Sequence, residues 1–188
     1  MIVLGVTGHR ILAEPAKIRA GVRRGLHRIS NAFPDHALTV LSALAEGADR
    51  LIAKEVLASP GALLVVVLPI AQEDYVTDFV SAASRAEFLK LIERAHQVIE
   101  LPPQPSRNAG YQSAGDYVVS HCDVLMTVWD GRDAQGQGGT GATVALARRK
   151  QIPIVWVKAG NRKPGTMTPT SLGVAQGEVS FENLGGGR

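Results

Sequence analysis

The sequence predicts an α/β domain in which a mostly parallel sheet is covered by helices on both faces. Short apolar runs rich in β-branched residues recur along the chain, and amphipathic stretches with helical spacing separate them. One run, "ALLVVVLP" at 62–69, is apolar at every position, as buried parallel strands are. Strands that alternate with helices imply right-handed crossovers and a doubly wound sheet.

Six strands and five helices are expected in this order. The strands are "MIVLGVTG" (1–8), "ALTVLSAL" (37–44), "ALLVVVLP" (62–69), "HQVIEL" (96–101), "DVLMTVWD" (123–130) and "IPIVWVK" (152–158). The helices are expected at 15–33, about 47–58, 81–95 and 111–120, with the last one after the glycine-rich stretch that begins at 136. The first helix has Pro15 in its first turn, where the missing N–H costs nothing.

The chain has 188 residues, enough for one domain with a sizeable core. We assign residues 1–158 to that domain. From 159 to 188 the sequence has no sustained period, so we expect an irregular or flexible C-terminal tail.

Charge and composition limit the possible partners. The formal net charge is +3, which permits an anionic partner without identifying one. Five basic residues and no acid lie between 16 and 33, which fits either a solvated helix face or a nucleic-acid contact surface. The single Cys122 excludes a disulfide framework within one chain. The longest apolar run (62–71) is about half a membrane span, and the start lacks a signal-peptide pattern, so we expect a cytoplasmic protein without a membrane partner.

Three polar clusters follow predicted strands: "TGHR" (7–10), "SALAEGAD" (42–49) and "DGRDAQGQGGTG" (130–141). In doubly wound sheets, ligands bind outside the carboxyl ends of the strands. The clusters therefore predict one crevice at that edge of the sheet.

The glycine-rich stretch matches G-x-G-x-x-G at Gly136, Gly138 and Gly141. A dinucleotide fingerprint should follow the first strand, with an acid about twenty residues later. Here the stretch follows the fifth strand, and "VKAGNRKPG" (157–165) has no carboxylate, so no nicotinamide or flavin cofactor is expected.

A phosphate or another anion still fits the glycine-rich stretch, because backbone N–H groups and a helix N-terminus attract negative charge. We expect contacts from Gly138, Gly139 and Gly141, and from the Thr140 hydroxyl. The alternative is a tight turn with Thr140 as the helix cap.

In the first cluster, Thr7 and Gly8 offer backbone amides, and His9 and Arg10 offer side chains to a ligand. Arg10 can take a phosphate with its planar fork. The alternative is a surface loop with a solvated arginine. No metal is expected at His9, because no second ligand has a suitable spacing.

The second cluster contributes Ser42, Glu46 and Gly47, and Asp130 follows the fifth strand. Glu46 can hold ribose hydroxyls or act as a general base, or it can simply complement a helix dipole. Gly47 would let the backbone approach a ligand. Asp130 is a candidate for a hydroxyl or base contact, so Glu46 and Asp130 are the candidate catalytic acids.

Three segments together resemble the SLOG superfamily, which includes LOG phosphoribohydrolases, DprA and nucleotide-sensing SLOG domains. They are "VTGHR", "LSALAEGADRLIA" and "DVLMTVWDGRDAQGQGGTGATVALAR". The chain resembles most the superfamily members that carry "VTGHR". The resemblance implies a Rossmann-like fold, a nucleotide-binding crevice and a homodimer.

The chain also departs from the hydrolases of this superfamily. Val144 and Ala145 stand where the glycine loop should lead into a catalytic glutamate, and Ala114 lies near the expected arginine position. The resemblance therefore implies nucleotide binding without the hydrolase side chains.

Three functions remain open. The chain binds a nucleotide or nucleotide-derived molecule as a sensor, or it cleaves an N-glycosidic bond with Glu46 or Asp130, or it binds single-stranded DNA through the basic helix and the sheet edge, as the resemblance to DprA suggests. None of these requires a bound cofactor or a metal.

Overall fold

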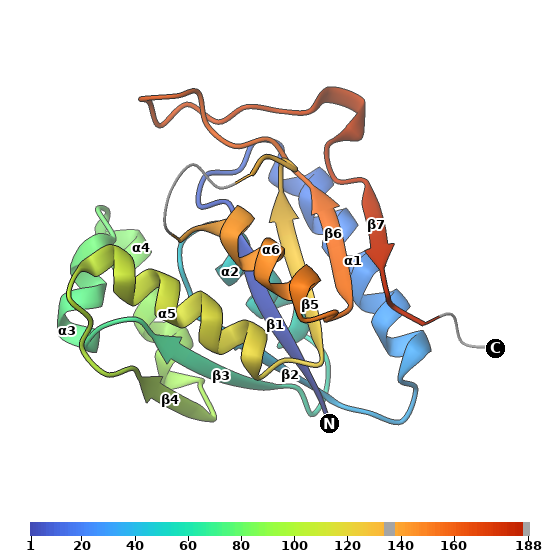
Figure 1. Cartoon of the computed structure of the whole chain (residues 1–188), viewed down its shortest axis with the longest axis horizontal. Helices are drawn as coiled ribbons and strands as arrows, with labels where there is room; N and C mark the ends of the chain where they lie inside the picture. The colour runs from blue at the N-terminus through green and yellow to red at the C-terminus, as the bar shows by residue number, and fades with distance from the viewer. Residues whose placement is uncertain (134–137, 186–188) are drawn as a thin grey trace.

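The computed structural model describes residues 1–133 and 138–185, and it confirms the predicted fold class (Figure 1). Seven strands form one sheet in the order β4-β3-β2-β1-β5-β6-β7. Their bounds are Ile2–Gly8 (β1), Leu38–Ser42 (β2), Leu63–Leu68 (β3), Gln97–Glu100 (β4), Val124–Trp129 (β5), Ile154–Lys158 (β6) and Val179–Glu182 (β7).

The order of the strands reverses beside β1. The chain proceeds outward from β1 through β2 and β3 to β4, and then returns to place β5 on the other side of β1. All these pairs are parallel, and β1 and β5 are in register from Leu4 opposite Val124 to Gly8 opposite Val128. The carboxyl ends of β1 and β5 therefore form a topological switch point, where doubly wound proteins bind ligands.

The helices form two layers, one on each face of the sheet (Figure 1). One face carries α1, α2 and α4, and the other carries α5 and α6. The bounds are Pro15–Ala32 (α1), Ala48–Val56 (α2), Ala82–Glu93 (α4), Arg107–Ser120 (α5) and Thr140–Arg149 (α6). Two short elements, α3 (Gln72–Tyr75) and η1 (Val76–Asp78), join β3 to α4 and were not expected from the sequence.

The two faces have separate cores. The α1 side buries the stripe Ile18, Val22 and Ile29 in a core that it shares with β5, β6 and α2. The α5 and α6 side has a smaller core around Val118, Leu125 and Trp129. In the part of the chain that the structure describes, no helix is long and apolar enough to cross a membrane.

The expectation of an irregular tail after residue 158 needs a correction. The tail contains a short η2 helix (Gly173–Ala175) and β7, which pairs antiparallel with β6 and completes the sheet. Between β6 and β7, residues 159–177 arch over the carboxyl ends of β5 and β6 (Figure 1), and we call this segment the roof. The two ends of the roof lie close together, because the Gly177 N–H donates to the carbonyl of Lys158, the last residue of β6, at 2.7 Å.

Candidate functional site

The switch point is braced by His9 and Asp130, which directly follow β1 and β5. The His9 N–H donates to the Val128 carbonyl at 2.9 Å, which extends the β1–β5 pairing by one residue. In return, the Asp130 N–H donates to Nε2 of His9 at 3.0 Å. The imidazole therefore fixes the first residue after β5.

Burial keeps the His9 imidazole neutral. The side chain is 8% exposed, and burial lowers the pKa of His9 despite the opposing effect of the Asp130 carboxylate. Asp130 Oδ1 lies 3.3 Å from Nε2, but Nε2 already accepts the backbone N–H and carries no proton in the neutral ring. His9 thus positions Asp130, and its expected direct ligand contact is not supported by this geometry.

Asp130 remains at the edge of the crevice. Its side chain is 9% exposed, and Oδ1 accepts the Arg132 N–H at 3.1 Å. Oδ2 is 3.9 Å from Nε of Arg132, beyond hydrogen-bond distance. One carboxylate oxygen is therefore held by the backbone, and the other has capacity for a further donor.

Arg10 and Glu46 form the second polar group of the site. Arg10 Nη2 donates to Glu46 Oε2 at 3.1 Å, with the two side chains 46% and 30% exposed. The other oxygen of Glu46 accepts a short hydrogen bond from the Ser84 hydroxyl. Glu46 is thus oriented from both sides while one edge of it stays open to solvent.

Ser42 and Gly47 serve the interior of the protein. Ser42 is fully buried, donates to Asp49 at 2.8 Å and accepts the Leu44 N–H at 3.0 Å, so a contact with ribose is not supported. Gly47 has φ +79°, and a Cβ there would lie 2.3 Å from the Arg10 carbonyl oxygen. We expected Gly47 to let a ligand approach the backbone, but the loop after β1 packs against it instead.

Two residues at the end of β1 have different surroundings. Thr7 is half-buried and lies opposite Thr127 of β5. A Cβ on Gly8 would lie 2.5 Å from the Ala48 Cβ, so this glycine lets α2 begin close to the end of β1.

The glycine-rich stretch leads into α6 at the switch point. Gly138 and Gly139 both have φ of +83°, and the ψ of 174° at Gly139 lies in a region that is accessible essentially to glycine alone. Gly139 is the N-cap of α6, so Thr140 is not the cap, and Thr140 and Gly141 form its partly exposed first turn. The remaining fingerprint residue, Gly136, lies outside the described residues.

Four of the five basic residues of α1 have partners in the chain itself. Arg19 and Arg23 contact Glu55 at 3.1 and 2.7 Å, and Lys17 pairs with Glu14. Arg24 donates to a backbone carbonyl of the roof at 2.6 Å. These contacts favour the solvated, ion-paired helix face among the two explanations that the sequence left open.

A cavity of about 240 Å³ lies between the end of β5 and the roof. Asp130 and Arg132 form one wall, and the roof forms the rest with Asn161, Arg162, Lys163 and Thr170 among its lining residues. Sequence reasoning found Asp130 but missed the roof residues. The only available signal was the pair of adjacent cations in a segment rich in turn-forming residues.

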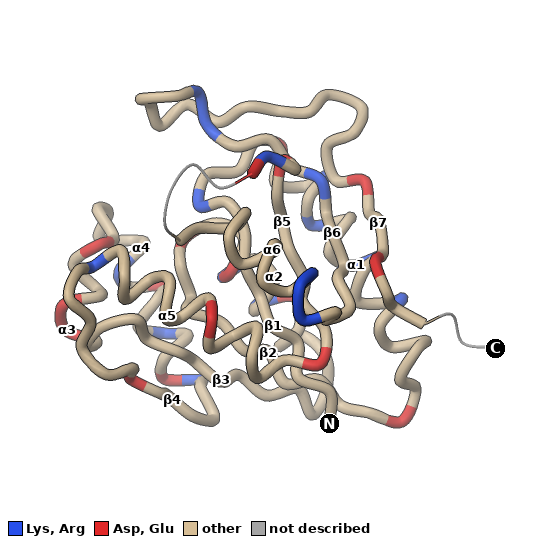
Figure 2. Tube along the Cα trace, in the orientation of Figure 1, with Lys and Arg blue, Asp and Glu red and all other residues tan. Residues whose placement is uncertain are grey.

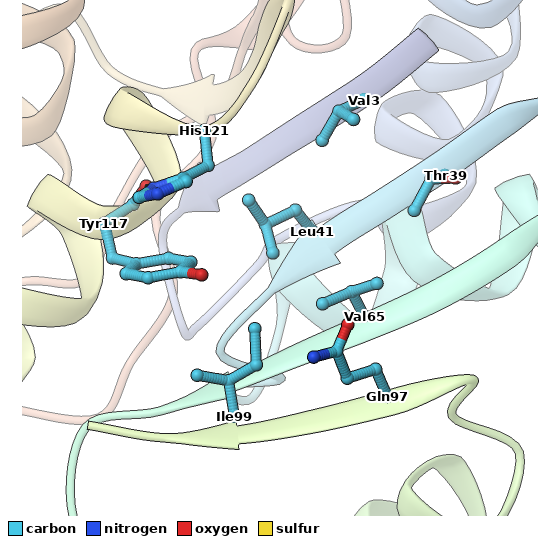
Figure 3. A pocket seen from close by; sticks show the side chains of 8 residues that line it. All are labelled: Val3, Thr39, Leu41, Val65, Gln97, Ile99, Tyr117 and His121. Atoms are coloured by element: carbon cyan, nitrogen blue, oxygen red, sulfur yellow. The ribbon is translucent and has the colours of Figure 1, made fainter. Parts of the chain in front are cut away.

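A second cavity, of about 170 Å³, opens on the α5 face of the sheet (Figure 3). Strand residues such as Leu41, Val65 and Ile99 form its floor, and the stacked rings of Tyr117 and His121 form its side, with centroids 3.9 Å apart. It lies toward the amino ends of the strands and has no Lys, Arg, Asp or Glu in its lining. It does not match the predicted anion site.

No protein-family model and no curated protein matches the chain. Among solved structures, the chain is similar to DNA processing protein A (DprA) from Streptococcus pneumoniae, with a TM-score of 0.57 and 18% identity over 93% of this chain and 52% of that chain. It also matches the molybdenum cofactor binding protein from Rippkaea orientalis, with a TM-score of 0.46 and 18% identity over 84% of this chain and 76% of that chain. The chain spans about half the length of the DprA chain, and this likeness supports the Rossmann-like fold alone.

Proposed function

We propose that the chain binds a nucleotide, or a molecule derived from one, at the carboxyl ends of β1 and β5, and acts as a cytoplasmic sensor of that ligand. The observation that carries the proposal is the glycine turn before α6. Gly138 and Gly139 have positive φ and lead into a helix N-terminus at the switch point. Such a turn offers backbone N–H groups to a phosphate.

Other groups that follow the strands at this edge of the sheet would complete the proposed site. Thr140 and Gly141 supply the first turn of α6, and Arg10 supplies a partly exposed guanidinium. Glu46, which Arg10 and Ser84 orient, is suited to accept hydrogen bonds from ribose hydroxyls.

The first test is binding of mononucleotides, dinucleotides and cyclic nucleotides by calorimetry, with chromatography of every ligand after incubation. We expect at least one to bind and to be recovered intact. Gly139→Ala should weaken that binding at least tenfold, because alanine cannot hold this backbone conformation without strain. Gly61→Ala is the matched control, since Gly61 also has positive φ, with open space around it. If no nucleotide binds, or if both variants bind equally well, the proposal is wrong.

The enzyme hypothesis is distinguished in the same experiment. Release of a free base would indicate cleavage of an N-glycosidic bond, and Glu46 and Asp130 are the acids at the site. Glu46→Gln should then abolish turnover and leave binding largely intact, whereas an unchanged rate would exclude Glu46 as the catalytic acid.

DNA binding is the alternative suggested by the likeness to DprA. Ion pairing on α1 weighs against it, because a surface that binds DNA gains affinity by releasing counterions from phosphates. Retention of single-stranded DNA that falls steeply between 50 and 200 mM salt, on the scale usual for such proteins, would support it. From the SLOG resemblance we also propose a homodimer, which sedimentation of the purified chain tests.

A further inference from the structure

The roof is held rigidly over the carboxyl ends of β5 and β6 by one buried side chain. Gln176 is 4% exposed, and its Oε1 accepts the N–H groups of Gly160 and Leu172, each at 3.0 Å. Its Nε2 donates to the carbonyl of Ala13 at 2.9 Å. Gln176 therefore joins both arms of the roof to each other and to the loop between β1 and α1.

Hydrogen bonds within the roof hold its tip in a small hairpin. The Thr170 N–H and hydroxyl both donate to the Asn161 carbonyl, at 2.6 and 2.9 Å. The Lys163 N–H donates to the Thr168 carbonyl at 2.9 Å. In the second half of the roof, the Ser171 hydroxyl donates to the carboxylate of Glu14, in the loop that precedes α1. The backbone that carries the roof cations is thus tied by hydrogen bonds at its tip and in its second half.

The cavity beneath the roof has an excess of positive charge. Arg132, Arg162 and Lys163 line it together with one carboxylate, that of Asp130 (roof cations in Figure 2). Within residues 1–133 and 138–185, no carboxylate oxygen lies within 4 Å of Arg162 or Lys163. The Arg162 guanidinium donates to the Met167 sulfur at 3.3 Å, which is a weak acceptor.

The basic residues of α1 provide an internal comparison. There Arg19 and Arg23 are satisfied by Glu55, whereas Arg162 and Lys163 line a cavity and have no carboxylate within 4 Å among the described residues. Like charges brought together cost free energy, which an anion between them offsets. A hydrogen-bonded backbone that brings two such cations to a cavity, with Arg132 on the other wall, is an arrangement suited to a bound anion.

We propose that this cavity binds a phosphate ester of a small polyol, such as a sugar phosphate. Arg132, Arg162 and Lys163 would contact the phosphate, and Asp130 Oδ2, which has acceptor capacity left, would take a hydrogen bond from a hydroxyl of the polyol. The volume of about 240 Å³ is below the roughly 300 Å³ at which pockets begin to enclose larger ligands, so a phosphate with its polyol fits better than a whole nucleotide. Asp130 is shared with the edge proposed for nucleotide binding, but the cations of this cavity and the glycine turn are different residues, so binding of an ester here does not depend on the function proposed above.

The test is titration of the full chain with glycerol 3-phosphate and ribose 5-phosphate, with inorganic phosphate and glycerol as partial ligands. Both tryptophans of the chain are suitable fluorescence reporters. Trp129 directly precedes Asp130, and Nε1 of Trp156 donates to the carbonyl of Trp129 at 2.9 Å. We expect saturable binding of at least one ester, weaker binding of phosphate, and none of glycerol.

Two double variants decide whether the roof cations are responsible. Arg162→Ser with Lys163→Ser should weaken ester binding at least tenfold. Lys90→Ser with Arg94→Ser removes the same charges from the exposed end of α4 and should change it less than twofold. Asp130→Asn should reduce the preference for ester over phosphate. Gly139→Ala should leave ester binding unchanged, which separates this site from the glycine turn.

Three results would overturn the inference: no binding of either ester, equal weakening in the two double variants, or phosphate binding as tightly as both esters. If nucleotide binding fails while ester binding depends on the roof, the proposed function is wrong and this inference stands.

Discussion

Replacing Gln176 by alanine tests whether the roof is a built part of the domain. The substitution removes three hydrogen bonds at once, to Gly160, Leu172 and Ala13. Each contributes a net of about 1 kcal/mol, so the expected loss of unfolding free energy is about 3 kcal/mol. For a chain of this size, that loss lowers the melting temperature by roughly 6–12 °C.

Hydrogen exchange locates the effect of this substitution. The amides of Gly160 and Leu172 lose their acceptor, so their protection should fall by more than that of amides in β1. Gln104→Ala is the matched control, because the Gln104 amide makes one exposed hydrogen bond, to the nearby Pro102 carbonyl at 3.0 Å. It should change stability by no more than about 0.5 kcal/mol. If the Gly160 and Leu172 amides keep their protection in the Gln176 variant, Gln176 does not hold the two arms of the roof together.

Three further predictions concern buried polar groups. Burial raises the pKa of Asp49 to about 6, so between pH 6 and 4 the folded protein carries a proton on Asp49 that the unfolded chain has released. The contribution of Asp49 to the free energy of unfolding should therefore rise by up to about 3 kcal/mol as pH falls from 6 to 4. Urea denaturation of Asp49→Asn should not show this rise. Burial lowers the pKa of His9, so its contribution falls as pH drops below about 6.5, and NMR titration of the ring should give a midpoint below that value; a midpoint above it would contradict the neutral acceptor. Arg50 is 2% exposed and donates to the carbonyls of Leu44 and Ser84 at 2.9 and 2.8 Å, so its replacement by alanine should cost about 3–5 kcal/mol. Lys54→Ala, which removes an exposed partner of Glu87, should cost no more than about 1 kcal/mol.

The sheet was predictable because each parallel strand is a short apolar run of its own. β3 lies within the predicted 62–69, and β5 within 123–130. The strand β7 was missed for a physical reason. It has four residues, its Phe181 is 41% exposed, and its pairing partner β6 lies across the whole roof in sequence. A strand of this kind forms because the folded sheet offers the free edge of β6 for pairing. The local sequence pattern of residues 179–182 therefore does not predict it.

The candidate site was predictable in place but less so in detail. Glu46 and Asp49 both follow β2 in a polar cluster, yet only Glu46 reaches the surface of the crevice, while Asp49 turns inward to Ser42. Three residues near a helix start are close to one turn, so their direction depends on exactly where α2 begins. Gly47, whose contact with the loop after β1 sets that start, was assigned to a ligand because sequence alone cannot tell a neighbouring backbone from a bound molecule.

The treatment of positive charge connects the predicted and the unpredicted parts of the edge. Basic residues are most concentrated in sequence on α1, and there Glu55 neutralises Arg19 and Arg23. Arg162 and Lys163, which have no carboxylate within 4 Å among the described residues, lie instead in the segment that looked irregular, where Arg162 is carried by a paired backbone. A run of basic residues in a sequence often forms a solvent-exposed helix face. An anion-binding site requires cations that the fold brings close together and leaves without carboxylate partners. By that criterion, the anion site that we propose lies at the roof and not on the basic helix.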